Sequence, residues 1–319
     1  MLAGAEKELQ GRPLILQGQD KTSAAVSALL EHLIDYAGLF PPAGLSMAEA
    51  VRNYAAYRAG EDRWALGRFV LPVARFDEFL VELRDLPGHN WPWHISALLG
   101  TDWPQDCARV QQLFEQSEGR AVVDSLEVKI GADASPATLR AMFPRDISIY
   151  CELDPPDWSR LSEIHDAGLR AKIRTGGVIE SAIPSAESVA DFLLACSHLQ
   201  MPFKATAGLH HPLRSRKPLT YDADAPQATM HGFLNVFLAA AVASGGDKDE
   251  VLEMLREDDT SRLELDDESI RWAQPSTAQT IGTCVFPDYD IQEVRKFATS
   301  FGSCSFREPI DESRELGLL

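Results

Sequence analysis

The chain has 319 residues, of which 45% are hydrophobic and 24% charged, with 21 glycines and 19 prolines. This composition is typical of a folded globular protein and excludes a disordered, collagen-like or coiled-coil chain. The formal net charge of -18 repels phosphate backbones and anionic lipid surfaces, so we expect neither nucleic acid nor membrane partners.

The N-terminal residues and the cysteines both favour a cytoplasmic protein. Residues 1–20 carry acidic and polar side chains where a secretory signal has a basic end and an apolar stretch. The longest apolar run, residues 232–243, is well short of the ~20 residues that span a bilayer. The five cysteines are widely spaced without a CxxC pair, which argues against a disulfide framework or a structural zinc site. A homo-oligomer is compatible with these features.

From about residue 66, short apolar runs rich in β-formers alternate with amphipathic stretches. This is the pattern of successive βα units around a parallel sheet. We predict strands at 68–73, 93–100, 125–131, 147–154, 169–176 and 202–209. Two further strands, near 33–40 and 269–274, would complete a (β/α)8 TIM-type barrel, which is an α/β fold.

The whole chain, residues 1–319, is predicted to form one barrel domain with additional helices near both ends. Residues 1–30 are expected to be an N-terminal extension. Residues 210–227 lack periodicity and are rich in Pro, Ser, Arg, Lys and Asp, which predicts a long loop after a late strand. Residues 246–268 are strongly acidic and predict a helical insertion at the surface.

Four consecutive predicted strands carry polar or charged side chains, although a parallel strand covered by helices is normally apolar on both faces. The pairs are Glu127 and Lys129, Glu152 and Asp154, Lys172 and Arg174, and Lys204 and Thr206. Within each pair the two residues are separated by one, so both side chains lie on the same face. Each pair also lies near the C-terminal end of its strand, where barrels of this type keep their active sites.

A single pair of this kind is usually a solvated strand end or a structural ion pair. Four pairs with the same parity predict a shared site, because burying so many charges without partners or a ligand would cost several kcal/mol each. The mixture of cations and carboxylates favours a small anionic substrate, a carboxylate or a phosphate. Arg174 is the expected bidentate anchor, and Lys129, Glu127 and Thr206 are expected to bind substrate beside it.

The two lysines point to covalent chemistry. A lysine held among other cations in a water-poor site has a lowered pKa, which allows its amine to attack a carbonyl and form a Schiff base. Lys172 and Lys204 lie on adjacent predicted strands, so we expect each to lower the pKa of the other. Glu152 or Asp154 would transfer the protons.

The motifs KIRTG at 172–176 and KATAG at 204–208 resemble the two lysine strands of deoxyribose-phosphate aldolase and other class I aldolases. In that family the lysine of the first motif forms the Schiff base, and the lysine of the second lowers its pKa. The resemblance covers about a third of the chain and implies a lyase. It would make Lys172 the nucleophile and Lys204 its electrostatic partner, and Glu152 lies where the family also places a glutamate.

The loop after the second lysine strand adds His210, His211 and Arg214, which we expect to overhang the site as a lid or an anion clamp. Together with His231 these histidines offer ligands for zinc or another divalent metal, and a metal-dependent hydrolase is one alternative function. No HxH or HxxxH spacing and no nucleotide-binding glycine motif is present, so no cofactor is predicted. A barrel that binds a metabolite without turnover is the other alternative.

The C-terminal motif GSCS at 302–305 precedes Glu308. Such a turn can offer backbone N–H groups to an anion, and it can equally be an ordinary loop. From the sequence alone, no base can be paired with Cys304 as a nucleophile.

Overall fold

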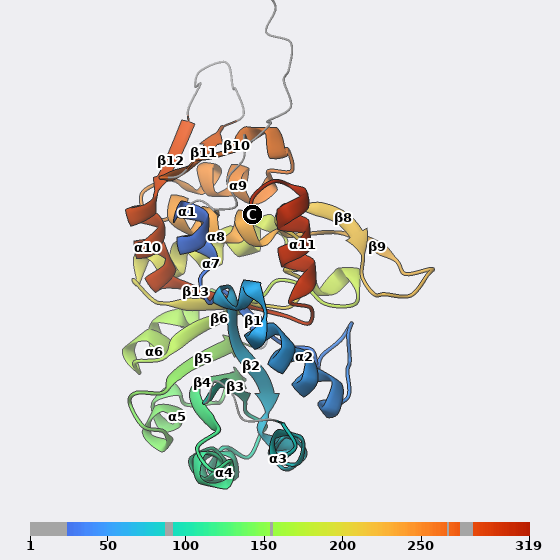
Figure 1. The fold of residues 1–319 in the computed structure, drawn as a ribbon. Coiled ribbons are helices and arrows are strands. Elements are labelled where there is room, and N and C mark those ends of the chain that lie inside the picture. The colour runs from blue at the N-terminus through green and yellow to red at the C-terminus, as the bar shows by residue number, and fades with distance from the viewer. Residues whose placement is uncertain (1–23, 87–91, 154–155, 267, 275–282) are drawn as a thin grey trace, which may run out of the picture.

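Eight parallel strands form a closed barrel, in the spatial order β1-β13-β7-β6-β5-β4-β3-β2 (Figure 1). The structure is a computed structural model and describes residues 24–86, 92–153, 156–266, 268–274 and 283–319. The barrel strands are Ile34–Tyr36 (β1), Leu66–Pro72 (β2), Trp93–Leu98 (β3), Ala121–Ile130 (β4), Ser148–Leu153 (β5), Arg170–Arg174 (β6), Phe203–Thr206 (β7) and Ala298–Ser303 (β13). The predicted (β/α)8 TIM-type fold is confirmed, and the strand predicted near 33–40 is β1.

Each barrel strand is followed along the chain by a helix, which lies on the outside of the barrel (Figure 1). These helices are Met47–Ala59 (α2), Phe76–Arg84 (α3), Trp103–Gln116 (α4), Pro136–Met142 (α5), Leu161–Asp166 (α6), Ala186–His198 (α7), Phe233–Val242 (α8) and Arg307–Glu315 (α11). Local signals start several of them, such as the capping box of Ser46 and Glu49 at α2. Within the described part of the chain, every helix is too short or too polar to cross a bilayer.

The apolar core lies between the barrel and its helices. Phe69, Phe203 and Phe301 are completely buried, and their rings pack against rings of other core residues. Because side chains alternate along a strand, the neighbours of these residues face the barrel axis. In the four middle strands, the described polar residues Glu127, Glu152, Lys172 and Lys204 accordingly face the interior of the barrel, where they contact one another.

The eighth barrel strand is β13, and the prediction of a barrel strand at 269–274 is wrong. That segment forms β11 (Ser269–Ala273), which pairs antiparallel with β10 (Leu263–Leu265) and β12 (Thr283–Pro287) in a separate three-stranded sheet. Short connections suffice for antiparallel neighbours, whereas a parallel strand needs a crossover, usually helical. Helix α10 (Asp288–Phe297) completes that crossover directly before β13.

The expected N-terminal extension ends before residue 30. Residues 1–23 lie outside the described residues, whereas α1 (Ala24–Leu30) belongs to the folded core. Its apolar side chains at 25, 26, 29 and 30 are buried, and the helix packs beside α10. The spacing of these buried positions is that of one helix face turned toward the protein.

Two other predicted segments contain more structure than expected. The predicted loop 210–227 includes β8 (Ser215–Pro218), which forms an antiparallel ribbon with β9 (Gln227–Met230). In Figure 1 this ribbon extends outward from the barrel. The described part of the acidic segment 246–268 is α-helical in its first half, as α9 (Lys248–Arg256), and then passes through a 3-10 turn at Thr260–Arg262 into β10.

The loops after β6 and β7 approach each other at Gly176 and Gly208. A Cβ added to either glycine would lie 2.8 Å from the Cα of the other, and Gly208 has φ +77°. We expect Gly208→Ala to lower the free energy of unfolding by roughly 2–4 kcal/mol, because an L side chain is strained at positive φ and the facing loop must move. Urea denaturation measures the change. Gly131→Ala, in the loop after β4 where a Cβ meets nothing within 4 Å, is the matched control, and an equal effect there would contradict the explanation.

Candidate active site

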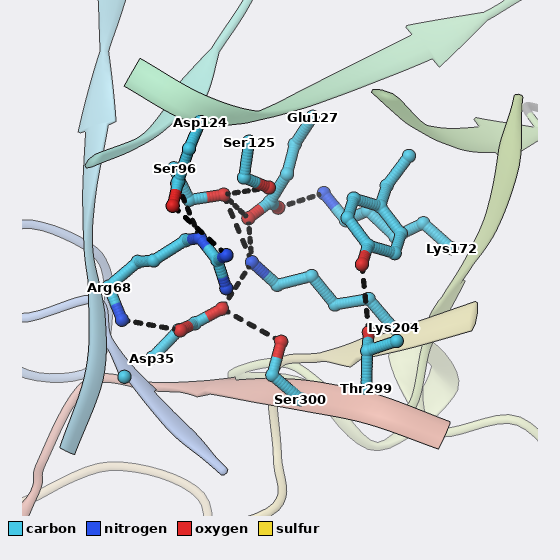
Figure 2. Close-up of polar contacts among 12 residues, drawn as sticks. Asp35, Arg68, Ser96, Asp124, Ser125, Glu127, Lys172, Lys204, Thr299 and Ser300 are labelled. Atoms are coloured by element: carbon cyan, nitrogen blue, oxygen red, sulfur yellow. Dashed lines mark hydrogen bonds and ion pairs between the residues drawn. The ribbon is translucent and has the colours of Figure 1, made fainter. Parts of the chain in front are cut away.

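Lys204 lies at the centre of a polar cluster inside the barrel (Figure 2). Its Nζ is 2.6 Å from Asp35 Oδ2, contacts Glu127 Oε1 and donates a hydrogen bond of 3.1 Å to Ser96 Oγ. Only 1% of Lys204 is exposed. Strands β1, β3, β4 and β7 therefore contribute side chains to one buried group.

Lys172 lies beside Lys204 and shares its carboxylate. The register of β6 against β7 places the two lysines opposite each other. Lys172 Nζ is 2.8 Å from Glu127 Oε2 and 3.1 Å from Glu152 Oε2, and 4% of the residue is exposed. Glu127 thus bridges the two lysines, with one oxygen on each ammonium group.

The two glutamates of the cluster are held in their charged form. Burial raises the pKa of Glu127, but the ammonium groups of Lys172 and Lys204 outweigh burial and hold this pKa well below its usual range. The pKa of Glu152 is also lowered. Burial raises this pKa, but the positive charges of Lys172 and the neighbouring cations outweigh burial. Both side chains are therefore carboxylates at neutral pH.

Lys204 is held in its charged form as well. Burial lowers its pKa, but Asp35 and Glu127 outweigh burial and leave this pKa raised. The expectation that each lysine lowers the pKa of the other is therefore wrong for Lys204. Two carboxylates contact its ammonium group, and their attraction exceeds the repulsion from Lys172.

Arg174 and Lys129 lie nearer the mouth of the barrel. Arg174 Nε is 3.2 Å from Glu152 Oε1, and Lys129 Nζ is 3.7 Å from the same oxygen. Their side chains are 45% and 54% exposed. Glu152 therefore connects the buried Lys172 to two cations that reach solvent. Asp154, the other predicted proton carrier, lies outside the described residues.

The remaining predicted residue of the strands, Thr206, ends β7 opposite Gly302 of β13. Deeper in the barrel, Asp35 Oδ1 accepts a hydrogen bond of 2.6 Å from the backbone N–H of Arg68. Its Oδ2 accepts one of 2.9 Å from Ser300 Oγ. Asp35 is completely buried, so its position is held by β2 and β13 as well as by Lys204.

The sequence connects Asp35 to the site only through a weakly defined first strand, and it does not mark Ser300 as a site residue. Asp35 lies in a strand of three residues, which is too short to show alternation, although a carboxylate between two buried apolar residues is a usable signal. Ser300 lies in the weakly apolar segment ATSFGS, which lacks the β-branched run that identifies a buried strand.

The structure gives the two predicted loop histidines partners outside the lysine cluster. His210 Nδ1 is 3.0 Å from Glu308 Oε2, and His211 Nδ1 is 2.9 Å from Glu312. Both glutamates belong to α11. The loop after β7 is thus attached to the C-terminal helix. In the described part of the chain, no contact supports the expected role of these histidines as a lid or anion clamp above the lysines.

The other two predicted loop residues are also engaged elsewhere. Arg214 Nη1 lies 3.5 Å from Asp258 Oδ2, in the segment after α9. His231 Nε2 lies 2.9 Å from the backbone oxygen of Pro184, the residue before the N-cap of α7. Among the described residues, no group of three or more His, Cys, Asp or Glu side chains is arranged to hold a metal ion.

The geometry therefore brings together four predicted residues in the barrel interior, Glu127, Glu152, Lys172 and Lys204, with Arg174 and Lys129 above them. The resemblance to class I aldolases stays a prediction based on two motifs. In comparisons with known proteins, no family model, no curated protein and no solved structure matches this chain.

Proposed function

We propose that the protein is an enzyme that cleaves or forms a carbon–carbon bond in small anionic carbonyl compounds, through an imine on Lys172. The observation that carries this proposal is the bridging position of Glu127, whose two oxygens contact Lys172 and Lys204 inside a closed parallel barrel. Glu152 adds a second carboxylate 3.1 Å from Lys172 Nζ. A lysine between two carboxylates has a proton acceptor on each side, which imine chemistry requires.

The reaction begins when Lys172 transfers one proton to Glu152. The neutral amine attacks the substrate's carbonyl carbon, and Glu152 returns the proton to the departing oxygen, which leaves as water while a protonated C=N bond forms. Glu152 then takes the proton of the β-hydroxyl group, and the electron pair of the breaking C–C bond moves into the imine, releasing a second carbonyl compound. Protonation of the enamine carbon by Glu152 and hydrolysis restore Lys172.

The exposed cations at the mouth support an anionic substrate. Arg174 carries a planar fork of donors that matches a carboxylate or phosphate, and Lys129 adds a second positive charge beside it. Lys172 is only 4% exposed, so a substrate reaches it by opening the contact between Arg174 and Glu152. The substrate's anionic group then replaces Glu152 as the partner of Arg174.

Borohydride trapping tests the imine. The protein is incubated with small aldehydes and keto acids that carry a carboxylate or phosphate, reduced, and measured by intact mass and peptide mapping. We expect a covalent adduct on Lys172 that is absent in Lys172→Met. Lys248→Met, which removes a surface lysine paired with Asp191, is the control and should be labelled like the wild type.

The same experiment separates the alternatives. Stabilisation against heat by a compound that leaves no adduct and undergoes no turnover would favour a metabolite-binding barrel. If a compound is turned over without leaving an adduct, and a chelator abolishes this turnover, the result would favour the metal-dependent hydrolase. Equal labelling of the wild type and Lys172→Met would contradict the assignment of Lys172.

A further inference from the structure

A second group of reactive side chains lies in the segments that follow β7 and β13. Cys304 comes directly after β13, and its Sγ lies 3.9 Å from Nε2 of His210. The other ring nitrogen, Nδ1, lies 3.0 Å from Glu308 Oε2 and 3.2 Å from Ser303 Oγ. The imidazole thus faces a thiol with one nitrogen and a carboxylate with the other. This is the arrangement in which a base activates a nucleophile and a third group orients the base.

A cavity of about 280 Å³ adjoins this group. His210, Glu308 and Tyr221 line it, and Tyr221 Oη lies 3.6 Å from Cys304 Sγ. Only 6% of Cys304 is exposed. Cys304 does not itself line the cavity, but His210 and Tyr221, which contact it, form part of the wall. A small molecule in the cavity would therefore lie one side chain away from the thiol.

The rest of the cavity wall indicates what it can hold. Much of it is apolar, with side chains from the loop after β1 and from the β8–β9 ribbon, namely Pro41, Pro42, Leu219 and Met230. The same wall also carries charged and polar side chains, among them His211, Lys217 and Asp222. Such a wall favours a small molecule that has both an apolar part and a polar reacting centre. An acyl group fits this description, because its carbonyl can meet the thiol while its chain contacts the apolar wall.

The groups around His210 favour the protonated form of its imidazole. Burial lowers the pKa of His210, but its contacts with Cys304 and Glu308 outweigh burial and raise the pKa to about 9. The imidazole beside the thiol therefore accepts and holds a proton readily at neutral pH. Burial and the neighbouring Cys304 raise the pKa of Tyr221, so its hydroxyl keeps its proton and remains a donor.

We propose that Cys304 is a nucleophile that accepts the acyl group of a small ester or thioester bound in this cavity, with His210 as its acid and base. The Sγ–carbon bond forms as Cys304 attacks, and the thiol proton resides on His210 Nε2. Tyr221 donates a hydrogen bond to the developing oxyanion. When the bond to the leaving group breaks, that group takes the proton from His210. Water, deprotonated by His210, then hydrolyses the thioester and releases a carboxylic acid and the free thiol.

Alkylation by iodoacetamide of the folded full chain tests the reactivity of the thiol. Peptide mass spectrometry follows each cysteine separately, so the half-buried Cys107 and Cys284 serve as internal controls. We expect Cys304 to react about tenfold or more faster than either control at neutral pH, although it is the more buried.

His210→Gln should lower the alkylation rate of Cys304 on the order of 10²-fold, because the base is lost. Unchanged rates at Cys107 and Cys284 will show that the variant remains folded. If Cys304 reacts no faster than these controls in the wild type, or keeps its rate in a folded His210→Gln variant, the assignment is overturned.

Acyl transfer is tested with p-nitrophenyl acetate. We expect an acetyl group on Cys304 and steady release of p-nitrophenol, both of them absent in Cys304→Ser. Lys248→Met, a change at the surface, should behave like the wild type here. Because the imine forms on a lysine and the acetyl group on Cys304, failure of the lysine chemistry and failure of the thiol chemistry are distinguishable. Absence of any acetyl group on Cys304 would refute the acyl-transfer role.

Discussion

Replacing Lys204 by Met is expected to lower the free energy of unfolding by roughly 3–5 kcal/mol, a large part of the ~5–15 kcal/mol that stabilises a typical domain. The Lys204 ammonium group is buried against Asp35 and Glu127. Methionine fills most of the same volume but leaves the two buried carboxylates with one counter-charge fewer. Urea denaturation at neutral pH measures the loss.

The effect of this substitution should also depend on pH in a defined direction. In the wild type the pKa of Lys204 is raised, so its contribution is fully present below the ordinary lysine pKa and is lost only at strongly alkaline pH. In Lys204→Met, Glu127 has lost one cation and binds a proton more readily. The difference in the free energy of unfolding between Lys204→Met and the wild type should therefore shrink as the pH falls from about 7 to about 5.

The control for Lys204→Met is Lys248→Met. Lys248 pairs with Asp191 at the surface, where both side chains are about half exposed. Exposed ion pairs contribute little, so this variant should stay close to the wild type. A loss in Lys204→Met no larger than that of the control would show that the ion cluster does not stabilise the barrel.

Glu127→Gln is expected to have a similarly large effect, roughly 3–5 kcal/mol at neutral pH. Glutamine keeps the shape of the side chain, but it removes the negative charge that lies between Lys172 and Lys204. The two buried ammonium groups then depend on Glu152 and Asp35 alone. Urea denaturation again measures the loss.

The pH dependence distinguishes this loss from a simple packing defect. The pKa of Glu127 is lowered in the folded protein, so its stabilisation is fully present above the ordinary glutamate pKa of about 4.3. It is lost as the pH falls through the folded pKa. We therefore expect the difference in the free energy of unfolding between Glu127→Gln and the wild type to be largest near neutral pH and to shrink in acid. Glu78→Gln, which removes an exposed partner of Arg75, is the control. A difference that stays constant with pH would contradict the electrostatic explanation.

The alternation within single strands was sufficient to predict that Glu127, Glu152, Lys172 and Lys204 share a face, because side-chain parity is a local property of an extended chain. The repeated βα pattern likewise predicted the barrel, since parallel neighbours require crossovers of that length. Where a segment is short or weakly apolar, as at Asp35 and in β13, no local pattern of this kind exists.

The tertiary structure alone decided which groups meet. Cys304 and His210 are 94 residues apart in the chain, and only closure of the barrel between β7 and β13 brings them together. The direction of the pKa shift of Lys204 was decided in the same way, because it depends on how many carboxylates surround the ammonium group. Coulomb interactions act through space, whereas a sequence pattern records only neighbours along the chain.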